Sequence, residues 1–180
     1  MSDKKIAVIF PGKNYSADSP LLYYACFTYE VRGYEVVPIN YGDLLKQDKP
    51  ISECVKEVMN AALMQLQAID LSNYDDIVFV SKSLGTVVAG WIDEKLCINV
   101  RHIFLTPVDR TLPYITKERN IIAVVSGTKD EQMDEGILKE HCIKENIYLK
   151  QIEGAGHRLE IWGDMDRNID ILKEVAALYQ

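Results

Sequence analysis

The stretch from Ile77 to Ile92 constrains the fold of this chain most strongly, because it joins a buried strand directly to a helix. Residues 77–80 are apolar and mostly β-branched, which is typical of a strand covered on both faces of a parallel sheet. Residues 86–92 read as the helix that follows, and Ser81-Lys82-Ser83-Leu84-Gly85 stands between the two. A turn this tight strains the backbone of its central residue, Ser83, and requires small residues two positions before and after it.

The same alternation of strand and helix runs through the rest of the chain. Further strands are predicted at residues 5–10, 34–39, 100–105, 120–125 and 147–152, and further helices at 20–33, 52–66, 134–141 and 167–178. This order predicts an α/β fold in one domain over residues 1–180, with a mostly parallel sheet of about six strands and helices on both faces. Pro38 cannot donate a ladder hydrogen bond, so its strand is expected at a sheet edge.

Composition excludes several classes of protein. The 180 residues carry a formal net charge of -7 without basic clusters, which argues against nucleic acid and anionic membranes as partners. No apolar run is long enough to cross a bilayer, and the N-terminus lacks a signal-peptide pattern. The four cysteines are widely spaced and predict free thiols in place of disulfides or a zinc site. We therefore expect a cytoplasmic protein, and its oligomeric state stays open.

Residues that could form a site follow the predicted strands. Gly12, Ser83, Asp130 and His157 each lie just past a strand end, and ligands bind at the carboxyl ends of parallel strands. Serine is a weak nucleophile and needs a base. His157, in a glycine-framed loop, is the candidate base that can reach Ser83.

The other two histidines are placed less well, since His102 lies near the start of its strand and His141 lies on or beside a helix. An imidazole base also needs an acid that fixes its tautomer. Asp130 is favoured, with Asp134 and Asp109 as alternatives. Asp130 could instead cap the following helix, and Ser83 could do the same for its own helix.

The stretch around Ser83 resembles the nucleophile elbow of α/β-hydrolases, with Ser81 at a position where glycine is usual. The order Ser83, Asp130, His157 matches the family's order of nucleophile, acid and base. The whole chain is similar to a compact, lidless serine hydrolase of the esterase or dienelactone-hydrolase-like kind that lacks the family's leading strands. Residues 106–113, where many members insert a lid, are few, which predicts an open cleft.

The resemblance implies Ser83, Asp130 and His157 as catalytic residues. It implies an oxyanion hole formed by the N–H of Leu84 and that of Gly12 or Lys13. The expected activity is cleavage of a small acyl ester or thioester through an acyl-enzyme on Ser83, with neither cofactor nor metal.

Two alternatives on the same fold stay open: a non-catalytic binding or regulatory protein, and an acyltransferase. A phosphate-binding α/β protein is disfavoured, because the chain has no P-loop or dinucleotide-binding glycine motif. Lys82, inside the elbow, could lie over the acyl pocket or point to solvent, and a functional role is disfavoured because most lysines are solvated.

Overall fold

Six parallel strands form the sheet on which the molecule is built. The computed structural model describes residues 4–45 and 51–179, with side chains of the second range from Val55 onward. The strands lie in the order β2-β1-β3-β4-β5-β6, and every neighbouring pair is parallel. Their bounds are β1 Lys5–Phe10, β2 Glu35–Pro38, β3 Asp76–Lys82, β4 Arg101–Leu105, β5 Asn120–Gly127 and β6 Leu149–Ile152. The predicted α/β class and the edge position of the Pro38 strand are both confirmed.

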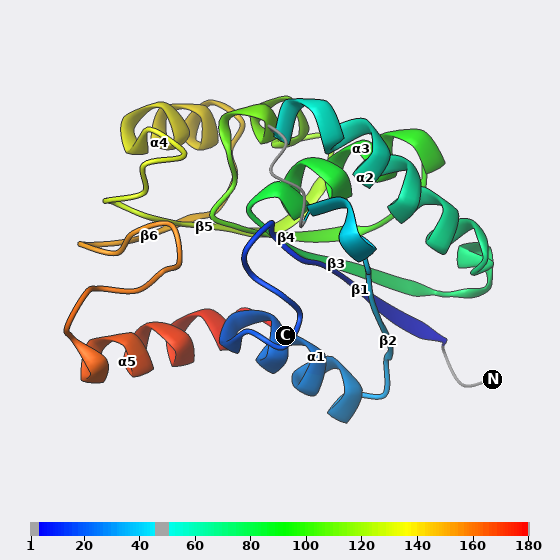
Figure 1. Ribbon diagram of the computed structural model, residues 1–180, viewed down its shortest axis with the longest axis horizontal. Coiled ribbons are helices and arrows are strands. Elements are labelled where there is room, and N and C mark those ends of the chain that lie inside the picture. Colours follow the sequence, from blue (N-terminus) through cyan, green and yellow to red (C-terminus); the bar gives the residue numbers. More distant parts are fainter. Residues whose placement is uncertain (1–3, 46–50, 180) are drawn as a thin grey trace.

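The described residues form five α-helices, and Figure 1 shows that helices cover both faces of the sheet. Their bounds are α1 Pro20–Val31, α2 Ile51–Gln67, α3 Leu84–Leu96, α4 Glu135–Lys144 and α5 Met165–Ala176. Helices α1 and α5 lie together on one face, and α2, α3 and α4 lie on the other. The strand residues between these layers are buried on both faces, which explains their near-continuous apolar sequence.

Several details of the elements differ from the prediction. The last strand begins at Leu149 and not at Ile147, whose N–H donates to the Cys142 carbonyl at the end of α4. Three short 3-10 helices, which no periodic pattern indicated, lie in the connections: η1 Gly42–Leu45, η2 Leu71–Asn73 and η3 Asp109–Tyr114. The polar connection predicted for residues 40–50 lies partly outside the described residues.

The free-thiol prediction holds for Cys26, Cys97 and Cys142, while Cys54 lies outside the described side chains. In the described part of the chain, no helix combines the length and apolarity that a membrane span requires.

Register brings the carboxyl ends of the central strands to one edge of the sheet. Phe10 of β1 pairs with Ser81 of β3, and Lys82 pairs with Leu105 at the end of β4. Leu105 in turn pairs with Val125 of β5. The loops that follow these strands are therefore held close together.

Candidate active site

The turn between β3 and α3 holds Ser83 in a backbone conformation with φ 55° and ψ -121°. A positive φ is uncommon for a residue other than glycine, and such strain persists only where the surroundings impose it. Although Ser83 stands at the N-cap position of α3, its side chain makes no capping hydrogen bond. The capping interpretation of this serine is therefore wrong.

The residues two positions away explain why the turn needs small side chains. A Cβ on Gly85 would lie 2.2 Å from the Phe10 carbonyl oxygen and 2.6 Å from that of Pro11. Ser81 is fully buried, and its hydroxyl donates to the Ile103 carbonyl at 3.3 Å. The helix can thus begin directly against the end of β1.

The hydroxyl of Ser83 contacts the imidazole of His157, with 2.7 Å between Oγ and Nε2. On the other side of the ring, Nδ1 lies 2.8 Å and 2.9 Å from the two carboxylate oxygens of Asp130. An ionised carboxylate only accepts hydrogen bonds, so Nδ1 carries the proton and Nε2 is left to accept from the serine. The structure thus brings together the three residues that sequence reasoning selected.

Asp130 is held in place by its surroundings. Its side chain is inaccessible to solvent, and Oδ1 also accepts a 2.8 Å hydrogen bond from the backbone N–H of Gln132. The Asp134 carboxylate instead caps α4 by accepting from the Ile137 N–H at 2.9 Å. Asp109 is exposed at the start of η3. Only Asp130, of these three carboxylates, contacts His157.

Neither of the other two histidines lies at this site. The His102 ring is buried at the start of β4, with Nε2 3.1 Å from Asp93, and burial lowers the pKa of His102. His141 donates from Nε2 to the Ile115 carbonyl at 2.7 Å. Both positions agree with their exclusion as the base.

Backbone N–H groups surround the serine. Leu84 is the first residue of α3, so its N–H has no acceptor within the helix. A Cβ on Gly12 would lie 3.1 Å from the Cβ of Ser83, so this loop passes directly beside the elbow. The Gly12 N–H, however, donates to the Tyr15 carbonyl at 3.0 Å. Lys13 is then the remaining candidate for the second oxyanion donor, since its backbone N–H finds no acceptor among residues 4–45 and 51–179.

Of the two placements open for Lys82, the one that points to solvent is wrong. Lys82 is 1% exposed, and its ammonium donates to the Thr106 hydroxyl and, at 2.6 Å, to the His157 carbonyl. Burial lowers the pKa of Lys82 from 10.5 to about 7. A signal was available in the sequence, because Lys82 lies at the end of a strand that is buried on both faces and therefore has little access to water.

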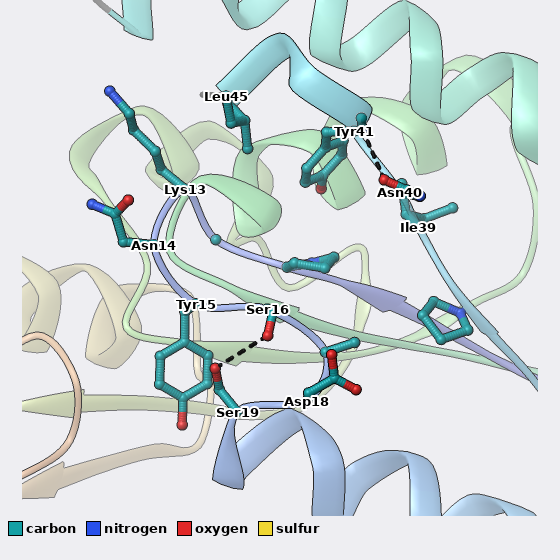
Figure 2. Close-up of a pocket in the computed structure, with 15 residues that line it drawn as sticks. Lys13, Asn14, Tyr15, Ser16, Asp18, Ser19, Ile39, Asn40, Tyr41 and Leu45 are labelled. Carbon is teal, nitrogen blue, oxygen red and sulfur yellow. Dashed lines mark hydrogen bonds between the residues drawn. The ribbon is translucent and has the colours of Figure 1, made fainter. Parts of the chain in front are cut away.

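Two cavities flank the elbow. The smaller, of about 300 Å³, contains Ser83 and is lined mainly by apolar side chains, together with three polar ones: Val55, Leu84, Val87, Val108, Asp109, Arg110 and Gln132. The larger, of about 1090 Å³, lies between the loop after β1 and the segment from Pro38 to Leu45. Figure 2 shows its polar lining and the side chains of Lys13 and Tyr15 on opposite sides of the loop.

Comparison with known proteins bears on this arrangement. No protein-family model and no curated protein matches the sequence. Solved structures do match. A putative hydrolase of the alpha/beta superfamily from Xanthomonas campestris superposes with a TM-score of 0.71 at 15% identity, covering 97% of this chain and 98% of the other.

Two further structures are described as serine hydrolases. An alpha-beta serine hydrolase homologue from Coxiella burnetii has a TM-score of 0.67 at 14% identity, over 97% of this chain and 85% of its own. A serine hydrolase without lid from Xanthomonas campestris has a TM-score of 0.64 at 14% identity, covering 99% of this chain and 84% of the other. The chain has the α/β-hydrolase fold.

The turn that holds Ser83 follows β3, which is third in the chain and central in the sheet. Helix α3 begins there and points its first N–H groups at the turn. In the described ranges, 4–45 and 51–179, no cluster of three His, Cys, Asp or Glu side chains could hold a metal ion.

Proposed function

We propose that this protein is a serine hydrolase that cleaves a small acyl ester or thioester through an acyl-enzyme on Ser83. The observation that carries the proposal is the hydrogen-bonded chain from Ser83 Oγ to His157 Nε2 at 2.7 Å and from Nδ1 to Asp130 at 2.8 Å. Its likeness in fold to structures described as serine hydrolases supports the same reading.

In the proposed reaction, Nε2 of His157 takes the hydroxyl proton of Ser83 as Oγ attacks the acyl carbonyl. The buried Asp130 carboxylate stabilises the imidazolium that forms. The N–H groups of Leu84 and Lys13 stabilise the oxyanion. The imidazolium then protonates the leaving alcohol or thiol. Water, activated by the same imidazole, attacks the ester on Ser83, so that the acid is released and the hydroxyl is restored.

The cavity that contains Ser83 supports a small acyl group as substrate. About 300 Å³ lined by Val55, Val87 and Val108 suits a short apolar chain. The larger, polar cavity beyond Gly12 is the site that we propose for a polar leaving group. The assignment of the two substrate halves is part of the proposal.

A fluorophosphonate probe tests the proposal directly, because it forms a stable adduct only with an activated serine. Intact mass should show one adduct on the wild type, and this adduct should be absent from Ser83→Ala and His157→Ala. Ser81→Ala is the matched control, since this neighbouring hydroxyl is buried and bonded to Ile103. A wild type that takes up no probe, or an adduct that survives Ser83→Ala, would overturn the proposal.

A further inference from the structure

Lys82 makes a set of contacts that the proposed reaction does not use. Its side chain is almost fully buried beneath the loop that carries His157. An ammonium has three N–H donors. One donates to the Thr106 hydroxyl, one donates to the His157 carbonyl at 2.6 Å, and the ammonium also lies 5.0 Å from the centre of the Tyr15 ring. Two of the three donors therefore have acceptors, and the charge also faces an aromatic ring, although the group is cut off from water.

These partners come from three different loops. Tyr15 follows β1, Thr106 follows β4 and His157 follows β6, while Lys82 itself ends β3. Tyr15 also connects this cluster to the loop that contains Gly12 and Lys13, because the Tyr15 carbonyl accepts a hydrogen bond from the Gly12 N–H. One side chain thus connects the loops that carry the nucleophile, the base and the candidate oxyanion donor.

Thr106 indicates that the cluster is held under strain. Its φ is 42°, which is a rare conformation for a β-branched residue. Its N–H donates to the Val125 carbonyl at 2.7 Å, and its hydroxyl accepts from Lys82. A strained residue of this kind persists where the surrounding contacts over-determine it.

A buried charge is costly unless other groups compensate it. No carboxylate in the described part of the chain forms an ion pair with Lys82. Asp130 and Glu160 act on it from a distance and favour its charged form, whereas Arg158 disfavours it. Desolvation is the largest effect and lowers the pKa of Lys82 to about 7. Such a cost is hard to explain by packing alone, since an apolar side chain of similar length would avoid it.

We propose that Lys82 is a positioning residue for the reaction of Ser83, holding the His157 backbone so that the imidazole stays in line with the serine hydroxyl. This inference rests on the proposed function.

The test compares Lys82→Met with wild type. Methionine keeps the length of the side chain but removes its donors and its charge. The rate of fluorophosphonate labelling is measured by intact mass between pH 5 and 9, and thermal melting reports on folding. We expect a loss of about tenfold or more in rate.

Lys129→Met is the matched control. This exposed lysine adjoins Asp130 in sequence, and its backbone N–H donates to the Ala155 carbonyl, a hydrogen bond that survives the substitution. Its labelling rate and pH profile should equal those of wild type. A second pair of variants tests the same contact and serves also if Lys82→Met does not fold. Thr106→Val removes one acceptor of the ammonium, and Thr106→Ser retains it. Thr106→Val should then label several-fold more slowly than Thr106→Ser.

The outcomes separate the two proposals. A wild type that never labels refutes the serine hydrolase, and the role of Lys82 falls with it. A wild type that labels, together with Lys82→Met that labels at an equal rate and with an equal pH profile, refutes the role of Lys82 alone. Slower labelling of Lys82→Met with a lower melting temperature, together with equal labelling of Thr106→Val and Thr106→Ser, would also overturn it, since general loosening of the fold explains that result.

Discussion

Gly85→Ala should be among the most damaging single-methyl additions to this protein. A Cβ at this position would lie 2.2 Å from the Phe10 carbonyl oxygen, 2.6 Å from that of Pro11 and 2.7 Å from the Phe10 carbonyl carbon. Comfortable contacts begin near 3.5 Å, so α3 and the end of β1 must separate by about 1 Å. All three obstacles are backbone atoms, and Phe10 is held in register with Ser81 of β3.

The expected loss in the free energy of unfolding follows from the groups that must move. Overpacking against side chains costs about 1–3 kcal/mol. Moving the end of a central strand also weakens ladder hydrogen bonds at about 1 kcal/mol each. The gain in helix propensity from glycine to alanine is at most about 1 kcal/mol. We therefore expect the free energy of unfolding of Gly85→Ala to fall by about 3–5 kcal/mol. Probe labelling should fall with it, because the Leu84 N–H moves away from Ser83.

Gly90→Ala is a matched control in the same helix. There the added Cβ would lie 2.4 Å from Cγ of the Tyr114 ring, which is a side chain in η3 and partly exposed. It would also lie 2.5 Å from Cβ of Tyr114, which does not move when the ring turns, so η3 must shift away from α3. Because η3 is a short connection and not a central strand, the loss should be about 1–3 kcal/mol and smaller than that of Gly85→Ala. Urea unfolding of both variants measures the difference. The reasoning fails if Gly85→Ala unfolds within 1 kcal/mol of wild type, or if Gly90→Ala is the more damaging of the two.

Two further predictions use residues around the same site. Asp130→Asn should slow probe labelling by about 10³-fold or more, because the amide no longer stabilises the imidazolium; Asp134→Ala should lower the free energy of unfolding by about 1 kcal/mol through the lost cap of α4 and leave labelling unchanged. Equal labelling of wild type and Asp130→Asn would contradict the assignment of the acid. The stability of Lys82→Met relative to wild type should also depend on pH. Because burial lowers the pKa of Lys82 from 10.5 to about 7, the unfolded wild type binds more protons than the folded one between these pH values. Wild-type stability therefore gains from this group as pH rises above 7, and below pH 7 the contribution is constant. The free energy of unfolding of wild type should rise relative to that of Lys82→Met by up to about 2–3 kcal/mol between pH 7 and 9, as measured by urea unfolding. A difference in stability that is independent of pH would contradict the burial of a titrating amine.

The local pattern of the sequence was sufficient for the architecture. Buried strands and amphipathic helices leave periodic signals, and their alternation leaves a parallel sheet as the natural arrangement. Pro38 marked the edge strand because it lacks a donor. Candidate groups could also be placed, since the carboxyl ends of parallel strands share one edge. Ser83 and His157 are 74 residues apart, yet both were found by their position after a strand.

Contacts between distant loops needed the tertiary structure. The choice among Asp130, Asp134 and Asp109 depended on which carboxylate reaches His157, and spacing along the chain does not contain that distance. The commitment of the Gly12 N–H to Tyr15 likewise depends on how one loop folds back on itself. Lys82 is the clearest case. Residue type favours a solvated lysine, but the loops after β1, β4 and β6 close over it, and only their joint packing decides that its ammonium lies buried against the backbone of His157.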